Sequence, residues 1–321
     1  MILDENTEIS EDILKGTSKA TITKLKDAGL TTLRQVAFTT PNEIVEKTEI
    51  KDIKTAKKAW MSAQKALLIY KTATELYHER LENVKRIKTG VEELDALLGG
   101  GIETGAITEL IGEYGAGKSQ ICFTASVLVQ LPEEQGGLNA KAIYFDTENT
   151  FVPERVYEIA EERGLEPFAI LDNITVIRAY NSEHLQILVR GLSEILKDEN
   201  YKLIVVDSMI GLFRSEYVGR ENLAPRQQKL NGVLSVLLRI ADAYRLAVLT
   251  TNQMISDPSG WGSGQKPAGG NIMAHAGTVR LKLNKKRQNL RIAEIIDSSY
   301  LPPGEAPFYI TSKGIEGKPE E

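Results

Sequence analysis

Gly112-Glu113-Tyr114-Gly115-Ala116-Gly117-Lys118-Ser119 is the stretch that decides the fold of this chain. It follows the apolar run Ala106 to Ile111 and comes directly before a helical pattern that begins at Gln120. Glycines, a lysine and a serine at this spacing are typical of a loop that binds phosphate, because backbone N–H groups can turn toward the anion and the lysine adds a positive charge. An ordinary glycine-rich turn is the alternative, since the chain has 26 glycines. The position between a strand and a helix favours phosphate binding.

The run Leu203-Ile204-Val205-Val206-Asp207 supports this interpretation. Four apolar residues that end in a carboxylate are typical of a buried parallel strand with the carboxylate at its C-terminal edge. Such strands are common, so the run alone is weak evidence. Beside the phosphate-binding loop it predicts a magnesium site made by Ser119 and Asp207. We therefore expect a bound nucleoside triphosphate with Mg²⁺, whose β and γ phosphates Lys118 contacts.

The composition is that of an ordinary globular protein, with 321 residues, 42% of them hydrophobic and 26% charged. This length allows one sizeable α/β domain and a small companion. Neither a signal segment nor an apolar run of the roughly 20 residues that cross a bilayer is evident, so we expect a cytoplasmic protein without a membrane partner. The single cysteine, Cys122, cannot form an intramolecular disulfide and is expected to pack in the core.

The apolar pattern divides the chain into parts. Residues 1–68 are expected to form a small helical domain, in which Ser18 caps one helix. A longer helical pattern covers residues 53–81, and residues 69–88 are expected to be the linker. In residues 89–321, apolar runs alternate with helical patterns, which predicts an α/β fold with a mostly parallel sheet. The runs are 106–111, 142–146, 174–178, 203–207 and 247–251, and two later runs, 278–283 and 290–296, are expected to pair as a hairpin.

Polar residues follow two further strands at the same edge of the expected sheet. The strand Ala142 to Phe145 leads to Glu148, which we expect to orient and deprotonate the water that attacks a γ-phosphate. A helix-capping or solvated glutamate is the alternative. The strand 247–251 leads to Gln253, whose amide can bond a γ-phosphate and respond to its loss, although amides are also common at strand ends. Glu148, Lys118 and Gln253 are thus the predicted catalytic residues.

Three features have the composition of nucleic-acid-binding segments. Residues 256–270 are rich in glycine and carry one aromatic, Trp261, which can stack on bases or anchor the loop on the domain. The segment 213–229 offers phosphates four cations, Arg214, Arg220, Arg226 and Lys229. Despite the net charge of −5, residues 258–293 lack Asp and Glu and contain Lys266, Arg280, Lys282, Lys285, Lys286, Arg287 and Arg291. A solvated basic hairpin is the alternative, but the neighbouring loop favours nucleic acid.

In this order, the elements resemble the RecA family of strand-exchange ATPases, most closely its archaeal RadA branch and the eukaryotic counterparts. The resemblance covers roughly residues 86–316 and extends well beyond the phosphate-binding loop. Its strings include Leu98-Gly99-Gly100-Gly101-Ile102-Glu103, Asp146-Thr147-Glu148, Thr150-Phe151-Val152-Pro153-Glu154-Arg155, Phe213-Arg214-Ser215-Glu216-Tyr217, Gly219-Arg220, Arg226-Gln227-Gln228-Lys229-Leu230, Thr251-Asn252-Gln253, Gly269-Gly270-Asn271 and Ala274-His275.

The resemblance implies a RecA-like ATPase core preceded by a small all-α domain similar to a helix-hairpin-helix domain. It implies a DNA-dependent ATPase that forms ATP-bound helical filaments on single-stranded DNA and catalyses pairing and strand exchange with double-stranded DNA in recombinational repair. By position, residues 112–120 and Arg155 would hold ATP, and Asp297 would reach a neighbour's ATP. Tyr70 and Ala73 would dock into the next subunit, a tyrosine on a helix face being the alternative. The DNA contacts would come from Arg214, Arg220, Arg226, Lys229, Trp261, Gly269, Gly270 and Asn271.

Three positions depart from the family pattern. Asn149 stands where the family usually has glycine, Ser299 where it has proline, and Pro303 where it has an acidic residue. Near the N-terminus, residues 15–18 match the first DNA-binding hairpin of the family, while residues 49–52 lack the glycine of the second. A recombination paralog or mediator with weak ATPase activity, which assists another recombinase, is therefore the alternative function. A ring-forming hexameric motor is a further one.

Overall fold

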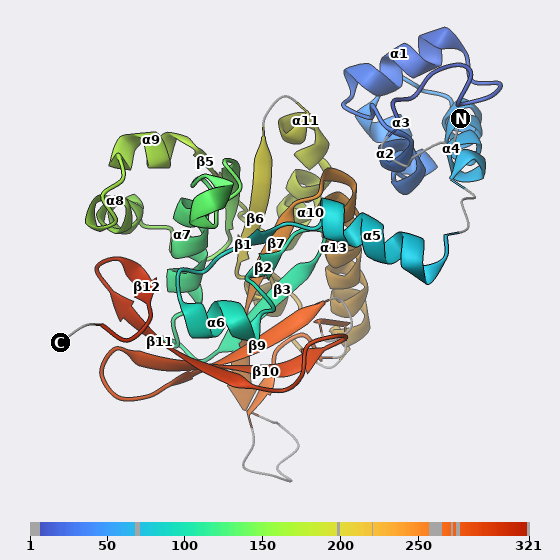
Figure 1. Ribbon diagram of the computed structural model, residues 1–321. Coiled ribbons are helices and arrows are strands. Elements are labelled where there is room, and N and C mark those ends of the chain that lie inside the picture. Colours follow the sequence, from blue (N-terminus) through green and yellow to red (C-terminus); the bar gives the residue numbers. More distant parts are fainter. Residues whose placement is uncertain are drawn as a thin grey trace. The chain divides into compact units, whose positions relative to one another are not determined.

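The computed structural model describes residues 7–67, 71–197, 200–219, 221–256, 265–270, 272–273 and 277–319. The chain divides into two compact units, residues 1–83 with 187–199, and residues 84–186 with 200–321 (Figure 1). Among the helices in this described part of the chain, none combines the length and apolar character that crossing a bilayer requires.

The smaller unit begins with four helices whose first turns are capped by side chains. They are α1 (Lys19–Asp27), α2 (Leu33–Phe38), α3 (Pro41–Lys47) and α4 (Ile53–Ala66). Ser18, Thr32, Thr40 and Asp52 accept hydrogen bonds from backbone N–H groups of these turns, so the predicted cap at Ser18 is confirmed. The apolar faces of the helices close over one core, which includes the fully buried Ile9, Leu14, Leu25, Leu33 and Ile44.

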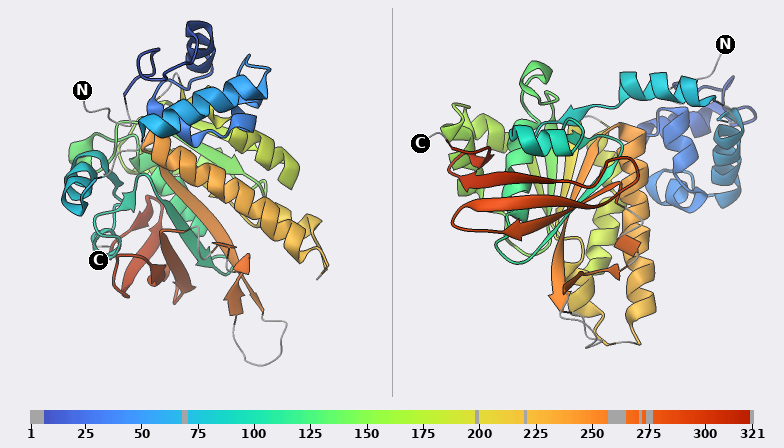
Figure 2. Two further views of the ribbon diagram at one scale, coloured as in Figure 1. Left: turned by 90° about the vertical axis from the view of Figure 1, so that its right-hand side faces the viewer. Right: turned by 60° about the horizontal axis from the view of Figure 1, so that its bottom comes forward.

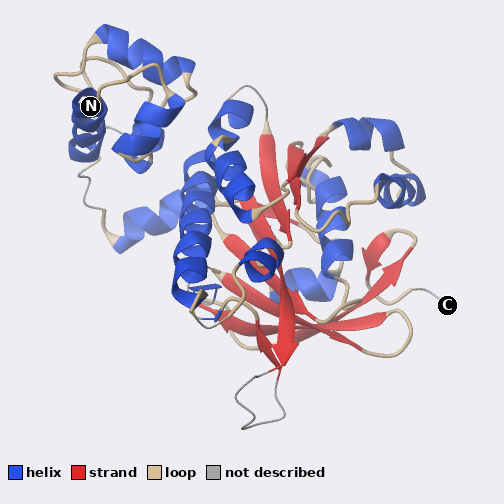
Figure 3. Ribbon diagram, turned by 180° about the vertical axis from the view of Figure 1, so that it is seen from behind, coloured by secondary structure: helices blue, strands red, loops and turns tan. Residues whose placement is uncertain are grey.

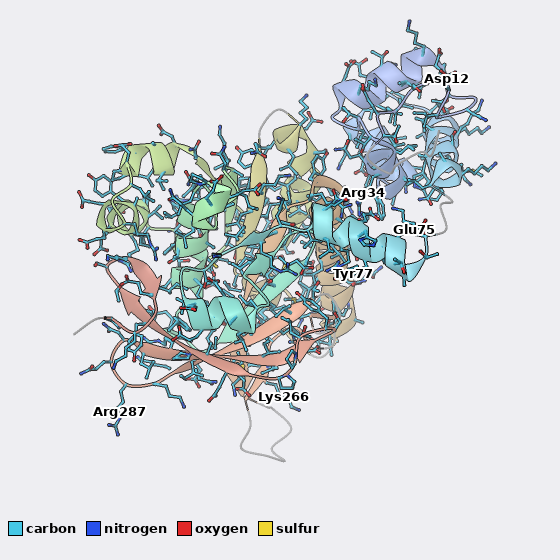
Figure 4. All side chains as sticks on the ribbon, in the orientation of Figure 1. Asp12, Arg34, Glu75, Tyr77, Lys266 and Arg287 are labelled. Carbon is cyan, nitrogen blue, oxygen red and sulfur yellow. The ribbon has the colours of Figure 1, made fainter. Side chains whose placement is uncertain are left out.

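The helical pattern over residues 53–81 forms two helices. α4 ends at Ala66, and α5 (Ala73–Asn83) begins after Thr72, which exchanges hydrogen bonds with Glu75 in a capping box. All residues of α5 are at least partly exposed, including Leu76, Tyr77 and Leu81. Figure 4 labels Tyr77 on this helix. These apolar residues continue the pattern of α4 across the break. Ala73 is the exposed first residue of α5, and Tyr70 lies outside the described residues.

The larger unit is built on a ten-stranded sheet with parallel central strands, which confirms the predicted fold class. The order is β12-β11-β10-β9-β3-β7-β6-β4-β5, and β8 (Gln265–Pro267) pairs with β7. The parallel strands are β3 (Ile107–Gly112), β7 (Ala247–Ser256), β6 (Tyr201–Asp207), β4 (Lys141–Asp146), β5 (Ile174–Arg178) and β9 (Val279–Lys285). The antiparallel strands β10 (Leu290–Ser298), β11 (Glu305–Thr311) and β12 (Gly314–Glu316) extend one side (Figure 2). The predicted hairpin is the pair β9 and β10.

Helices cover both faces of this sheet (Figure 3). Those that lie within the larger unit are α6 (Glu92–Leu97), α7 (Lys118–Leu128), α8 (Pro153–Glu162), α9 (Pro167–Asp172), α12 (Gly211–Glu216) and α13 (Leu223–Tyr244), with a 3₁₀ turn at Glu133–Gln135 and a small sheet of β1 (Arg86–Ile87) and β2 (Ile102–Glu103). α10 (Ser182–Arg190) begins in the larger unit and ends among residues of the smaller unit, which also contains α11 (Leu192–Leu196). α7 is buried from Ile121 to Leu128, which accounts for its apolar sequence on every side. Cys122 lies in this buried stretch, as predicted.

The carboxyl ends of the central strands meet at one edge, and this register assembles the site. Gly112 of β3 lies opposite Gln253 of β7, and Asp146 of β4 lies opposite Asp207 of β6. In open α/β sheets, ligands bind in the crevice beyond these strand ends. The residues singled out in the sequence therefore share one edge because of the parallel topology.

Candidate active site

The phosphate-binding loop between β3 and α7 depends on glycine at three positions. Gly115 and Gly117 have φ of +74° and +101°, a backbone conformation that other residues rarely adopt. A Cβ atom at Gly117 would lie 3.3 Å from the ring of Phe308, and one at Gly112 would lie 2.8 Å from the carbonyl oxygen of Leu283. The loop is therefore packed against strands β9 and β11 at Gly112 and Gly117, while Gly115 is required for its backbone conformation.

Lys118, the first residue of α7, faces back onto the loop. Its Nζ donates hydrogen bonds to the carbonyl oxygens of Gly112 and Glu113, each at 2.9 Å. Burial lowers the pKa of Lys118, and the carboxylates of Asp207 and Glu148 oppose this effect. A phosphate in the loop would replace two neutral acceptors by charged ones and stabilise the ammonium form. The lysine thus fits the predicted role.

Asp207, at the end of β6, collects three hydroxyl groups around its carboxylate. Ser119 Oγ and Tyr144 Oη donate to Oδ2 at 2.6 and 2.8 Å, and Thr251 Oγ1 donates to Oδ1. Mg²⁺ in nucleotide sites is held by one or two carboxylates together with phosphate oxygens and water. The pair of Ser119 and Asp207 fits this ligand set. Tyr144 and Thr251 were not predicted, although Thr251 begins the polar string at the end of β7.

A cavity of about 1070 Å³ opens over this edge of the sheet. This volume lies at the upper end of those of small-molecule sites. The predicted residues that line it are Gly112, Glu113, Tyr114, Gly115, Gly117, Lys118, Ser119, Gln120, Glu148, Arg155, Asp207 and Gln253. Ala116 is buried beneath the loop. Both the volume and the polar groups at its floor fit a nucleoside triphosphate.

Glu148 lies in a tight turn after β4. The carboxylate of Asp146 accepts hydrogen bonds from the N–H groups of Thr150 and Phe151, at 3.0 and 3.2 Å, and so closes the turn. Asn149 has φ of +56°. Asparagine is among the residues that tolerate this left-handed conformation, which glycine adopts freely. Asn149 therefore adopts a backbone conformation that the glycine of the family pattern would also allow.

Glu148 and Gln253 contact each other across the cavity floor. Glu148 Oε1 accepts hydrogen bonds from Ser208 Oγ at 2.5 Å and from Gln253 Nε2 at 3.0 Å. The oxygen of the Gln253 amide accepts one from Arg214 of α12 at 3.1 Å. The structure thus joins the two predicted catalytic side chains directly. The sequence did not predict that Ser208 donates a hydrogen bond to Glu148 or that Arg214 lies beside Gln253.

Arg155 and Arg291 support the walls of the cavity. Arg155 Nε donates to Gln120 Oε1 at 2.9 Å, and its terminal nitrogens donate to the carbonyls of Thr311 and Ser312. Arg291 Nε donates to the carbonyl of Gly115, in the phosphate-binding loop, at 3.1 Å. Both arginines therefore tie loop and helix to the antiparallel strands.

A buried polar cluster that the sequence did not reveal contacts residue 268, near the end of the glycine-rich segment 256–270. Glu109, fully buried in β3, forms an ion pair with Arg280 of β9 at 2.6 Å and accepts a hydrogen bond from Asn252 Nδ2 at 2.6 Å. Asn252 Nδ2 also donates to the carbonyl of Ala268 at 2.7 Å. Burial raises the pKa of Glu109, and Arg280 opposes the increase. The cluster fixes residue 268 to the end of β7.

Two of the four cations predicted to bind DNA in the segment 213–229 have protein partners. Lys229 pairs with Glu183 and lies 5.3 Å from the centre of the Tyr217 ring, and the hydrogen bond with Glu183 raises the pKa of Lys229. Arg214 donates to Gln253. Arg226 is half-buried on α13. Arg220, Trp261 and Asn271 lie outside the described residues.

The two segments predicted to bind DNA, residues 213–229 and 256–270, are in contact at α13. Gln227 Nε2 donates to the carbonyl of Gly269 at 3.0 Å. Gly269 and Gly270 have φ of +88° and +61°, so glycine is required at the point where the chain returns to the domain. Gln227 was present in a family string but was not predicted as a link between these segments.

The basic segment is smaller on the surface than its sequence indicates. Arg280 and Arg291 are buried and held by Glu109 and by backbone carbonyls. Lys285, Lys286 and Arg287 are exposed at the turn between β9 and β10, and Lys266 is exposed on β8 (Figure 4). The interpretation of all seven cations as one basic surface was therefore wrong for the two buried arginines, because Arg280 pairs with the buried Glu109 of the neighbouring strand and Arg291 bonds backbone carbonyls.

Hydrogen bonds hold the segment that follows Asp297, in which Ser299 stands where the family pattern has proline. Asp297 is exposed on β10 opposite Arg280, and among the described residues it is not one that lines the cavity of its own chain. Ser298 Oγ accepts a hydrogen bond from the N–H of Leu301 at 3.1 Å. Tyr300 Oη donates to the buried Glu103 at 3.0 Å. These bonds fix the backbone around Ser299.

Comparison with known proteins agrees with this geometry. The Rad51 family profile matches residues 79–318. The chain is 48% identical over 304 residues to the DNA repair and recombination protein RadA of Aeropyrum pernix, covering 94% of this chain and 95% of that protein. It is 47% identical to the proteins of the same name from Metallosphaera sedula and Ignicoccus hospitalis, over 310 and 316 residues, each covering 96% of this chain and 95% of the relative. The chain belongs to the Rad51 family of RecA-like ATPases.

Proposed function

We propose that this chain is a DNA-dependent ATPase that assembles as a helical filament on single-stranded DNA and catalyses strand exchange in recombinational repair. The proposal rests on a series of contacts between side chains at the carboxyl edge of the sheet. One cavity is lined by the phosphate-binding loop, Asp207, Glu148 and Gln253. Gln253 contacts both Glu148 and Arg214, and Arg214 belongs to the segment 213–229 that we expect to bind DNA. A site built in this way can link hydrolysis of a nucleotide to the state of bound DNA.

The proposed cofactors are ATP and Mg²⁺, which supply a reactive phosphoanhydride and a charge that neutralises it. Lys118 would hold the phosphates, and Ser119 with Asp207 would hold the metal. Glu148 orients the attacking water and accepts its proton, and Gln253 responds to the loss of the terminal phosphate. Arg155 and Gln120 would position the nucleotide from the side of α7 and α8.

The proposed partners are single-stranded and double-stranded DNA and further copies of the chain. Arg214, Arg220, Arg226, Lys229, Trp261 and residues 269–271 would form the DNA surface. Tyr70 and Ala73, in a linker at residues 69–88 between the helical and ATPase parts, would dock into the next subunit, where Asp297 would reach the neighbour's ATP. Since DNA is the substrate, we place the protein in the cytoplasm at the nucleoid, where recombination mediators or paralogs would be further partners.

A recombination paralog with weak ATPase activity is the second candidate. The observation that favours it is Pro303, which stands where the family pattern described above has an acidic residue. The contacts of Glu148 with Ser208 and Gln253, and the left-handed turn kept by Asn149, favour an active enzyme.

Strand exchange between circular single-stranded DNA and a homologous linear duplex tests the proposal. We expect joint molecules with the native chain and ATP, and none with Lys118→Ala. Glu148→Gln should bind ATP and DNA and form joint molecules, while its turnover falls by about 10²–10⁴-fold. Joint molecules that form equally well with Lys118→Ala would contradict the role of the loop, and their absence with the native chain would favour the accessory protein.

A further inference from the structure

The first turn of helix α12 lies directly on the carboxylate of Glu148. The N–H of Gly211 donates to Ser208 Oγ at 3.1 Å, and that hydroxyl donates to Glu148 Oε1 at 2.5 Å. A Cβ atom at Gly211 would come within 2.7 Å of the same Glu148 oxygen. Glycine at the start of α12 therefore lets the helix that leads into the first DNA segment approach the catalytic carboxylate closely.

Arg214 makes a second connection from the same helix. It lies three residues after Gly211, so both residues lie on one face of α12. One terminal nitrogen of Arg214 donates to Gln253 Oε1 at 3.1 Å, and Gln253 Nε2 donates to Glu148 Oε1 at 3.0 Å. A guanidinium group can only donate and a carboxylate can only accept, so these two neighbours fix the orientation of the amide between them. The bonds run in one direction from Arg214 to Glu148.

This arrangement restrains Glu148. Its Oε1 accepts hydrogen bonds from Ser208 and Gln253 together, and each bond competes with a water that the carboxylate would orient. While Arg214 holds the oxygen of Gln253, the amide nitrogen cannot turn away toward a phosphate. Release of Gln253 would therefore free one acceptor site on Glu148 and one donor for the nucleotide.

The bond that holds Gln253 can be exchanged for one to phosphate. Arg214 is exposed, and its partner in the described structure is a neutral amide oxygen. The bond from Arg214 to Gln253 is charged only at the donor, whereas a bond from a guanidinium to a phosphate is charged at both groups and is frequently bidentate. A DNA phosphate that reaches α12 would displace the amide from Arg214.

We propose that Arg214 is a positioning residue that keeps Gln253 on Glu148 until a DNA phosphate binds its guanidinium. The inference rests on the proposed function and deepens it, because it assigns the DNA dependence of hydrolysis to one side chain. Without DNA, Arg214 maintains the restrained arrangement. With DNA, the phosphate takes the guanidinium, and Gln253 and Glu148 become available to the nucleotide.

The test compares Arg214→Met with the native chain in steady-state ATP hydrolysis, with and without single-stranded DNA. We expect the DNA-free kcat of Arg214→Met to rise by about two- to tenfold, the range that loss of one restraining hydrogen bond gives. The ratio of the kcat with DNA to the kcat without DNA should fall toward one, while the KM for ATP stays unchanged. Ser215→Ala, on the same helix but bonded only to the carbonyl of Leu212 among the described contacts, should retain the native rates.

A second comparison shows whether Arg214 acts through Gln253. In a Gln253→Ala background, Arg214→Met should not change the DNA-free rate further, because the restraint is already gone. Arg214→Lys retains the charge without the planar fork and should give an intermediate DNA-free rate. A merely structural arginine would instead lower thermal stability and leave the ratio of the two rates as it is.

The outcomes separate this role from the proposed function. A native chain stimulated by DNA, with an Arg214→Met variant whose DNA-free rate does not rise and whose DNA affinity alone falls, would overturn the role of Arg214. An additive effect of Arg214→Met in the Gln253→Ala background would overturn it as well. A native chain whose hydrolysis does not respond to DNA would overturn the proposed function and this role together.

Discussion

Glu109 shows at the scale of one residue how a buried charge can organise a loop. A carboxylate with no solvent access is unfavourable unless its oxygens are paired. Here one oxygen faces Arg280 and the other faces Asn252, which in turn holds Ala268 and accepts the N–H of Gln253 at 2.7 Å. The backbone at Gln253, the proposed sensor, and at Ala268 is thus fixed to the centre of the sheet.

Removal of Glu109 should therefore be far more harmful than removal of the whole pair. We expect Glu109→Ala to lower the free energy of unfolding by about 3–5 kcal/mol, because Arg280 would remain buried without its partner. Glu109→Leu combined with Arg280→Met should lose much less. Urea unfolding of the single and double variants measures both values, and equal losses would show that the pair is not coupled.

At the scale of the element, the close packing of β3, the phosphate-binding loop and β9 determines where glycine is required. A Cβ atom at Gly112 would meet the carbonyl oxygen of Leu283 at 2.8 Å, and both atoms belong to neighbouring strands that cannot separate without disturbing the sheet. By contrast, no atom lies within 4 Å of the Cβ position at Gly232, on the exposed side of α13. The same substitution should have opposite effects at these positions.

Gly112→Ala is expected to destabilise the protein by about 1–3 kcal/mol and to weaken ATP binding, because the strand ends must move apart. Gly232→Ala should stabilise it by about 0.5–1 kcal/mol, since alanine favours a helix interior over glycine. Thermal unfolding and titration with a fluorescent nucleotide measure the two effects. If Gly112→Ala bound nucleotide with native affinity, the close packing of the loop would not matter for the site.

At the scale of the whole molecule, the linker and α5 carry the proposed contact between copies. α5 presents Leu76, Tyr77 and Leu81 with exposed fractions of 50%, 61% and 64%, and it begins at Ala73, the proposed docking residue. A helix with apolar residues and no buried face is typical of one that packs against a partner. The interface proposed from Tyr70 and Ala73 would continue onto this helix.

Ala73→Glu should prevent self-association, because a charged side chain would enter an apolar docking site. We expect light scattering with a non-hydrolysable ATP analogue to show monomers for this variant and large assemblies for the native chain. Met61→Ala, at an exposed position of α4, is the matched control and should assemble normally. Assemblies of native size with Ala73→Glu would place the interface elsewhere.

Much of the fold followed from the sequence because each signal was local. Apolar runs that end in polar residues predicted β4, β6 and β7, and parallel topology then brought Glu148, Asp207 and Gln253 to one edge. The helical pattern over residues 53–81 did not show at which residues α4 ends and α5 begins, since α5 continues the apolar pattern of α4. Glu109, Arg280 and Asn252 were missed because their pairing joins residues that are up to 171 positions apart, which no local pattern encodes.

The measurement that tests the central claim most directly is ATP hydrolysis with and without single-stranded DNA, combined with electron microscopy of the same samples in a non-hydrolysable ATP analogue. The claim is that the cavity at the sheet edge hydrolyses ATP under the control of DNA in a self-assembled filament. We predict DNA-stimulated turnover and helical filaments on the DNA. A rate of ATP hydrolysis that is the same with and without DNA, or closed rings in place of filaments, would contradict the account.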